Sequence, residues 1–232
     1  MNADPPARRK RPGLERRLKT WLGGDLSTPA GRRRAWWSVQ LIDHAFLRVF
    51  WHNFHEVAPG IYRSNQPDAR RFERYKALGI RSVVSLRGGA DTAVMAFQQE
   101  TCARLGLPIH MVPMSARGLA PAARYLQLLD LFETVERPFL IHCKSGADRT
   151  GLGAAFYLID QMGQSVAEAA RQLSPRYLHF RRSKTGILDA LLDSYAETGE
   201  AEGMSLRDWL ATRYDPEAIT ARFKGASVID QS

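Results

Sequence analysis

The stretch Phe139-Leu140-Ile141-His142-Cys143-Lys144-Ser145-Gly146-Ala147-Asp148-Arg149-Thr150-Gly151 decides how this chain folds. It begins with an apolar run, and a helix-like apolar stretch from Leu152 to Met162 follows it. The pattern predicts a strand, a tight loop and the start of a helix, with Gly146 making the turn. Inward-facing N–H groups of such a loop form a nest for an anion, and the helix N-terminus adds partial positive charge.

Two side chains of this stretch point to chemistry. Cys143 stands at the strand end and Arg149 six positions later, so a curled loop brings both toward one point. Positive neighbours lower the pKa of a thiol, and a guanidinium holds two phosphate oxygens at once. The residues predict a thiolate nucleophile facing a phosphate dianion. The alternative is a buried structural cysteine beside an unrelated arginine.

The pattern C-x5-R-T, with His142 before it and Gly151 after it, resembles the signature loop of the cysteine-dependent protein tyrosine and dual-specificity phosphatases. The segments 62–67 (YRSNQP) and 79–87 (GIRSVVSLR) are similar to those of a bacterial dual-specificity-type subgroup. A rhodanese-type sulfur-transfer loop also curls around a cysteine at a strand end. The Arg149-Thr150-Gly151 helix start favours the phosphatase.

The resemblance implies a role for each residue of the loop. Cys143 attacks phosphorus and forms a phosphocysteine, which water then hydrolyses. Arg149 binds the equatorial oxygens together with the backbone of the loop, and Thr150 hydrogen-bonds the sulfur. His142 positions the loop from behind. The residues expected to bind substrate through the loop are Lys144, Ser145, Gly146 and Ala147.

The general acid departs from the family pattern. Most members carry an aspartate on a loop some way before the cysteine, but the corresponding residues 112–119 contain no carboxylate. Asp148, inside the loop, is the expected substitute, and the myotubularin lipid phosphatases carry an aspartate in the same slot. A nearby phosphate dianion raises the pKa of a carboxyl, as an acid requires. The alternative role of Asp148 is to cap the following helix, and His110 and Ser115 are poorer candidates for the acid.

Positive charge around the loop bears on the substrate. Arg117 lies on the loop where the acid usually sits and is expected to hold a second anionic group of the substrate, and Lys144 is similar to a lysine found in family members that act on inositol lipids. A further basic cluster stands at residues 181–184. Together they favour a substrate with more than one negative charge, which is a phosphoprotein or a phosphorylated lipid or glycolipid.

The net charge of +9 over 232 residues is unevenly placed. Residues 1–34 hold ten basic and three acidic side chains, so this segment carries +7. We expect a basic, largely disordered tail. An anionic membrane surface is its expected partner ahead of nucleic acid, and a solvated tail with no partner is the alternative.

Three further segments follow the tail. Residues 35–55 are rich in aromatic side chains and predict a helical segment that packs on the domain or lies at a lipid interface. No cysteine or carboxylate cluster accompanies the three histidines in it, so no metal is expected. Residues 56–200 form the predicted phosphatase domain, and residues 201–232 form a C-terminal helical extension.

Alternation of strands and helices predicts an α/β three-layer sandwich around a mostly parallel sheet of about four to five strands. The phosphate site then lies at the carboxyl ends of the strands. The predicted strands are 61–64, 80–86, 107–114 and 139–142. The predicted helices are 70–78, 92–105, 121–136, 151–162, 165–173, 185–195, 206–212 and 216–223.

The two cysteines, Cys102 and Cys143, make a disulfide framework unexpected and fit a reducing compartment. Cys102 is expected in the core, with a reversible disulfide to Cys143 as the alternative. No run approaches a membrane span, and no signal-peptide pattern opens the chain. We expect a cytoplasmic, metal-independent and cofactor-free phosphatase, peripheral on the inner membrane face. The alternatives are a phosphate-binding pseudophosphatase and a sulfurtransferase. The oligomeric state stays open.

Overall fold

The fold is built on a five-stranded sheet with helices on both faces, as the computed structural model shows for residues 26–41, 51–88 and 93–229. The strand order is β1-β2-β5-β3-β4. Only the β1–β2 pair is antiparallel, and the other pairs are parallel. The predicted α/β sandwich with a mostly parallel sheet is confirmed. The strands are β1 (His55–Ala58), β2 (Ile61–Ser64), β3 (Ser82–Ser85), β4 (Ile109–Met111) and β5 (Phe139–His142).

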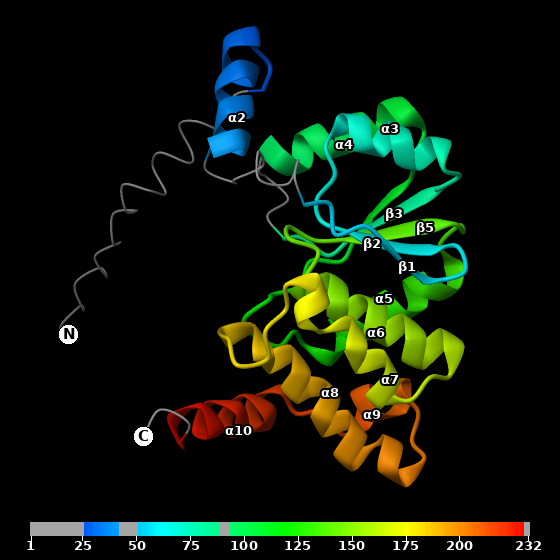
Figure 1. Ribbon diagram of the computed structural model, residues 1–232, viewed down its shortest axis with the longest axis vertical. Helices are drawn as coiled ribbons and strands as arrows, with labels where there is room; N and C mark the ends of the chain where they lie inside the picture. The colour runs from blue at the N-terminus through cyan, green and yellow to red at the C-terminus, as the bar shows by residue number, and fades with distance from the viewer. Residues whose placement is uncertain (1–25, 42–50, 89–92, 230–232) are drawn as a thin grey trace, which may run out of the picture.

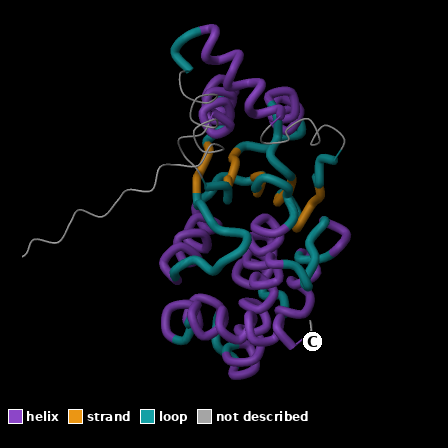
Figure 2. The backbone as a smooth tube through the Cα atoms, turned by 90° about the vertical axis from the view of Figure 1, so that its left-hand side faces the viewer, coloured by secondary structure: helices purple, strands orange, loops and turns teal. Residues whose placement is uncertain are grey.

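Two helical layers enclose the sheet. Helices α3 (Ala69–Ala77) and α4 (Ala93–Leu105) cover one face, with α2 (Pro29–Leu41) beside them (Figure 1). Helices α5 (Ala122–Thr134) and α6 (Asp148–Met162) cover the other face, as the turned view in Figure 2 also shows. The remaining helices lie beyond this second layer. They are α7 (Val166–Ala169), α8 (Ile187–Thr198), α9 (Leu206–Thr212) and α10 (Pro216–Ile229).

Successive side chains of the central strand β5 point to opposite faces of the sheet and pack in two separate cores. Phe139 and Ile141 belong to the large cluster shared with α5, α6 and α8. Leu140 belongs to the smaller cluster under α3 and α4. The register aligns Ser64 of β2 and Ser85 of β3 with His142. Because three parallel strands end at one level, the loops that follow them meet at the carboxyl edge, where Cys143 comes next.

Several element boundaries differ from the sequence-based prediction. The strand predicted over 107–114 is paired only at Ile109–Met111, because Pro108 and Pro113 lack the N–H that a ladder needs. Strand β1 was not predicted. Helix α6 begins at Asp148, three residues earlier than expected, so the loop before it is shorter.

The terminal segments also differ from expectation. Helix α2 begins at Pro29, within the segment predicted to be a disordered tail, and no helix covers residues 51–54. Most of the predicted basic tail and residues 42–50 lie outside the described residues. In the C-terminal segment, Leu206, Trp209 and Leu210 of α9 are buried in the large core. No helix among the described residues combines the length and the hydrophobicity that crossing a bilayer requires.

Candidate active site

The loop between β5 and α6, residues 143–147, is the centre of the site and is called the signature loop below. Gly146 has φ +74°, and a Cβ on it would lie 2.6 Å from the backbone nitrogen of Asn65. Only glycine fits both the left-handed conformation and this close approach to the end of β2. The predicted turn at Gly146 is therefore present, and it seats the loop directly on the neighbouring strand.

Arg63 of β2 braces the loop from behind. Its Nη2 donates to the carbonyls of Gly146 at 2.7 Å and Ala147 at 3.3 Å, while Nη1 donates to both oxygens that Gln172 offers. The guanidinium lies 3.7 Å from the centre of the Tyr177 ring. Burial lowers the pKa of Arg63 to about 10, so it remains charged at neutral pH. By holding these carbonyls outward, Arg63 leaves the N–H groups of the loop to face the other way.

Two more residues hold the backbone of the loop. Asn53, buried and with φ +48°, donates from Nδ2 to the carbonyl of Ser145 at 3.3 Å and to that of Tyr177 at 3.0 Å. The backbone N–H of Gln66 donates to the carbonyl of Lys144 at 3.2 Å. With Arg63, these contacts engage the carbonyls of four consecutive residues, 144–147. The loop is thus held in its shape before any ligand arrives.

The thiol of Cys143 lies at the bottom of this loop and is almost fully buried. Burial alone raises its pKa, but Arg149, the hydroxyl of Thr150 and the N–H groups of Thr150 and Gly146 outweigh it, so the pKa is lowered overall. Cys102 gives the contrast within the same chain, because burial in the small core raises its pKa to about 12. The two cysteines belong to clusters on opposite faces of the sheet, and Cys102 is packed in the core as expected.

Arg149 and Thr150 place hydrogen-bond donors beside the thiol of Cys143. The Nε of Arg149 and the Oγ1 of Thr150 are buried and have no hydrogen-bond partner of ordinary geometry among the described residues. Nη1 of Arg149 makes only long contacts of 3.4 Å, to the carbonyls of Leu86 and Met114. A buried donor without an acceptor destabilises a folded protein. Donors of this kind beside a thiol therefore indicate a site that binds the oxygens of an anion.

His142 lies on the opposite side of β5 from the thiol. Its Nδ1 donates to the carbonyl of Cys143 at 3.2 Å, and its Nε2 accepts from the side chain of Gln98 at 2.6 Å. Gln66 in turn donates to Gln98. Burial lowers the pKa of His142 to about 3, so the ring is neutral. This arrangement fits the predicted supporting role, because a neutral ring with a fixed tautomer transfers no proton at the site.

Asp148 makes contacts that the sequence analysis did not foresee. Its Oδ1 lies 2.8 Å from Nδ1 of His179, whose Nε2 lies 2.7 Å from Oδ2 of Asp189. Burial alone raises the pKa of Asp148, but hydrogen bonds from His179 and Thr185 lower it overall. The carboxyl is therefore ionised at neutral pH, whereas the sequence analysis expected a phosphate dianion to raise its pKa.

The other predicted site residues lie at the rim. Ser145 is exposed and Lys144 is half-buried on the signature loop, while Gly146 and Ala147 are buried beneath them. Arg117 is exposed on the loop that follows Met114, the residue whose carbonyl meets Arg149. The structure thus brings the Arg117 loop to the edge of the site. Within the part of the chain that the structure describes, no hydrogen bond or ion pair ties its side chain to the signature loop.

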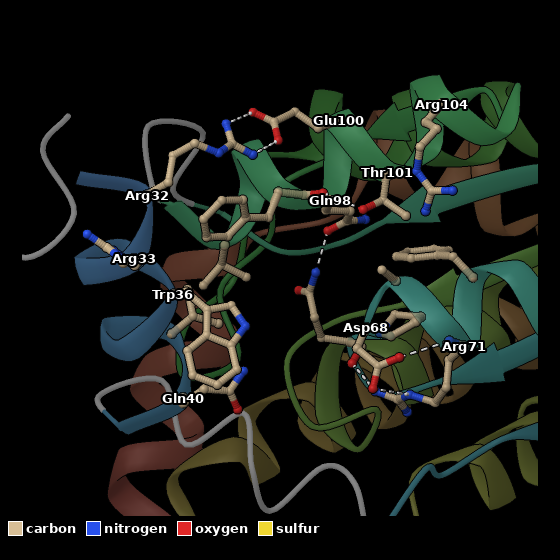
Figure 3. A pocket seen from close by; sticks show the side chains of 17 residues that line it. Arg32, Arg33, Trp36, Gln40, Asp68, Arg71, Gln98, Glu100, Thr101 and Arg104 are labelled. Atoms are coloured by element: carbon tan, nitrogen blue, oxygen red, sulfur yellow. Dashed lines mark hydrogen bonds and ion pairs between the residues drawn. The ribbon is translucent and has the colours of Figure 1, made fainter. Parts of the chain in front are cut away.

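A cavity of about 720 Å³ lies beside the support of the signature loop, between α2, α3 and α4 (Figure 3). Arg32 of α2 spans its rim and forms a two-pronged contact with Glu100 of α4. Gln66 and Gln98, which lead to His142, line its wall. None of the site residues predicted from the sequence lines this cavity, so it is separate from the thiol.

Comparisons with known proteins agree with this geometry. The family described as "Swiss Army Knife protein, DSP-PTPase phosphatase domain" matches residues 53–198. Dual specificity protein phosphatase TpbA of Pseudomonas aeruginosa strain UCBPP-PA14 is 29% identical over 190 residues, which cover 80% of this chain and 78% of TpbA. TpbA of strain PAO1 is 32% identical over 155 residues, covering 66% of this chain and 65% of the relative.

Solved structures support the fold. Tk-PTP in its active form matches with a TM-score of 0.51 at 18% identity, covering 64% of this chain and 99% of that one. The core catalytic domain of the PP-IP phosphatase SIW14 from S. cerevisiae matches with a TM-score of 0.50 at 20% identity, covering 60% and 85%. At these identities the likeness concerns the arrangement of strands and helices alone.

Proposed function

Because this chain belongs to the Swiss Army Knife group of DSP-PTPase phosphatases, we propose that it hydrolyses phosphomonoesters through a phosphocysteine formed on Cys143. The Cys143 thiolate attacks phosphorus, and the bond to the leaving oxygen breaks. Arg149 and the loop N–H groups hold the equatorial oxygens, and Thr150 stabilises the sulfur as it departs. Water then hydrolyses the thiophosphate and restores the thiolate.

One observation carries this proposal more than any other. The thiol of Cys143 is buried yet has a lowered pKa, because the guanidinium of Arg149 and the hydroxyl of Thr150 act on it, and among the described residues the buried Nε of Arg149 has no hydrogen-bond partner. A structural cysteine in a core behaves as Cys102 does, with a raised pKa. A buried thiol whose pKa is lowered by nearby donors is typical of a nucleophile, and the same donors can hold an anionic substrate.

We propose Asp148 as the proton donor to the leaving oxygen. It is the first residue of α6, directly after the signature loop, and its side chain is 19% exposed. The loop that holds the acid in most relatives has no carboxylate here, between Met114 and Leu119. A bound phosphate dianion raises the pKa of a neighbouring carboxyl, which opposes the lowering by His179 and Thr185.

For the substrate, we propose a phosphoprotein, which is what the name of the TpbA relatives implies for them. A phosphorylated lipid or glycolipid at an anionic membrane surface is the second candidate. The exposed side chains of α2 favour it, because Trp36 is 49% and Trp37 is 56% exposed on a helix that also carries Arg33. Tryptophan and arginine side by side are typical of a helix at a lipid interface.

The enzyme proposal is tested with p-nitrophenyl phosphate in the presence of a chelator. Cys143→Ser and Arg149→Ala should abolish turnover, while Cys102→Ala, the matched thiol control, should retain it. Full activity of Cys143→Ser would overturn the phosphocysteine route. Phosphate binding without turnover in the wild type would instead favour a pseudophosphatase, and a persulfide on Cys143 would favour sulfur transfer.

The membrane proposal needs a separate measurement. Sedimentation with phosphatidylserine vesicles at physiological salt should pull down the full chain, and Trp36→Ser with Trp37→Ser should weaken that binding. The control is Trp51→Ser, another exposed tryptophan that lies outside α2. Equal binding by the double variant and the wild type would contradict a lipid-facing α2.

A further inference from the structure

A buried histidine beside the signature loop joins two carboxylates. His179 has a side chain with 0% exposure, Nδ1 lies 2.8 Å from Asp148, and Nε2 lies 2.7 Å from Asp189. Both ring nitrogens are therefore within hydrogen-bond distance of a carboxylate oxygen. A neutral imidazole has only one N–H, so this geometry suits the doubly protonated ring, which donates on both sides.

Three separate parts of the chain build this arrangement. Asp148 is the first residue of α6, and Asp189 lies in the first turn of α8. His179 comes from the connection between them, where its backbone N–H donates to the carbonyl of Ser174 at 3.1 Å. Thr185, near the start of α8, is a neutral donor to Asp148. The order in space is signature loop, Asp148, His179 and Asp189.

The charge state of His179 follows from its neighbours. Burial alone lowers its pKa, but the hydrogen bonds and charges of Asp148 on α6 and Asp189 on α8 outweigh burial and raise the pKa to about 9. These two carboxylates are the charged groups that act on the ring among the described residues. At neutral pH the ring is thus cationic and carries a proton aimed at Asp148.

We propose that His179 is a positioning residue that stores the proton which Asp148 delivers to the leaving group. This inference rests on the proposed function, in which Asp148 is the acid. When a phosphate dianion binds at the N-terminus of α6, it disfavours a second negative charge on Asp148. The Nδ1–H bond of His179 then breaks and the proton bonds to the Asp148 carboxylate. The ring becomes neutral and keeps its Nε2–H on Asp189.

The proton count closes over one turnover. In the first step Asp148 gives its proton to the leaving oxygen, as the P–O bond breaks and the S–P bond to Cys143 forms. In the second step water adds its oxygen to phosphorus and the S–P bond breaks. The proton that this water releases goes to Asp148 and returns to His179. No proton is drawn from bulk solvent into the site during either chemical step.

The first experiment compares His179→Gln with the wild type on two substrates. Loss of general-acid catalysis lowers the turnover of an alkyl phosphate by about 100-fold or more, because its leaving group needs a proton. We expect His179→Gln to show a selective loss of this kind. p-Nitrophenyl phosphate has an activated leaving group and should be hydrolysed at close to the wild-type rate. In the wild type the descending limb of kcat/KM against pH for the alkyl phosphate reports the free enzyme and should lie near the pKa of His179, and in His179→Gln it should move to lower pH.

Asp189 and Asp193 supply a matched pair of variants on α8. Asp189 contacts His179, whereas Asp193, one turn later, pairs with Arg181 at the surface. Asp189→Asn should lower alkyl phosphate turnover selectively, and Asp193→Asn should leave it unchanged. If His179→Gln and Asp189→Asn lost activity equally on both substrates, His179 would not store the proton and would have a structural role alone. Retained activity of Cys143→Ser would instead overturn the proposed function.

A second measurement uses the wild-type protein, so it holds even if His179→Gln fails to fold. Nitrogen-15 NMR of the labelled histidine ring reports which nitrogens carry protons. Without ligand both nitrogens of His179 should be protonated at pH 7. Saturation with inorganic phosphate should convert Nδ1 to the unprotonated form and leave Nε2 protonated. A ring that stays doubly protonated with phosphate bound would overturn the proposal.

Discussion

The Nη2 of Arg63 lies 2.7 Å from the carbonyl oxygen of Gly146, which joins the second strand to a loop 83 residues later. This contact turns a carbonyl of the signature loop away from the thiol and fixes the position of the glycine. It also places a buried positive charge behind Cys143, and the two charges interact. The shape of the anion site thus depends on a residue that touches no substrate.

We predict that Arg63→Met destabilises the protein and reduces activity together. The variant removes the Arg63 hydrogen bonds to the buried carbonyls of Gly146 and Ala147, of which Ala147 keeps the donor N–H of Gly151, and each lost hydrogen bond to a charged group costs about 1.5–3 kcal/mol. Urea denaturation measures the free energy of unfolding. The control is Arg81→Met, an exposed arginine paired with Glu136, which should change stability by less than about 1 kcal/mol. Equal stability of the two variants would contradict the bracing role.

A second prediction concerns Gly146→Ala. The new Cβ would stand 2.6 Å from backbone atoms of the β2 end at φ +74°, so the loop must shift and activity should fall by at least about tenfold. Gly163→Ala is the matched control, because φ there is +63° but nothing lies within 4 Å of the added carbon. It should cost about 1 kcal/mol of stability and keep its kcat. Steady-state kinetics on both variants separates the effect of a left-handed backbone from that of the close contact at Gly146. An equal loss of kcat in both variants would contradict the role of that contact.

The two cysteines should differ in reactivity at neutral pH. The pKa of Cys143 is lowered and that of Cys102 is raised to about 12, so Cys143 presents the larger thiolate fraction. Iodoacetate should label Cys143 alone, and inorganic phosphate should slow that labelling by occupying the same site. Peptide mass spectrometry after timed alkylation gives both rates. If Cys102 were labelled as fast as Cys143, the signature loop would not be activating the thiol of Cys143.

Stability should fall in alkaline solution because of His179. Its pKa is raised from 6.5 unfolded to about 9 folded, so the folded state holds its proton more tightly. That contribution is fully present below pH 6.5 and is lost as pH rises through about 9. Asp148 acts in the other sense, because its lowered pKa favours the folded state above its unfolded pKa and not in acid. Urea midpoints between pH 6 and 10 should decline in the wild type and stay flatter in His179→Gln.

The sequence predicted the parts of the site that are local. Residues adjacent in the chain predict strand β5, the turn at Gly146 and the start of helix α6. Cys143 and Arg149 then indicate the chemistry of the loop between them. Much of the sheet was also predictable, because β3 and β5 lie in largely apolar stretches of ordinary length. Strand β1 was not predicted, and the strand predicted over 107–114 is paired only at Ile109–Met111, where prolines shortened the pairing.

The supporting residues could not be predicted in the same way. Arg63, Asn53 and His179 reach the loop or its first helix residue from 83, 92 and 31 positions away. The residues next to each of them in the sequence do not indicate a partner, because a contact between distant parts of the chain has no characteristic sequence separation. Arg63 gave one signal: a charged residue between Tyr62 and Ser64 in a short strand next to the central one must be paired if it is buried.

The most direct test of the account is to trap the covalent intermediate during turnover. The wild type is mixed with p-nitrophenyl phosphate, quenched rapidly and digested, and the peptide containing Cys143 is examined by mass spectrometry. We predict that this peptide carries one phosphoryl group on sulfur and that Cys143→Ser gives none. An unmodified Cys143 under conditions of steady turnover, with the phosphoryl group on another residue or on none, would contradict the account.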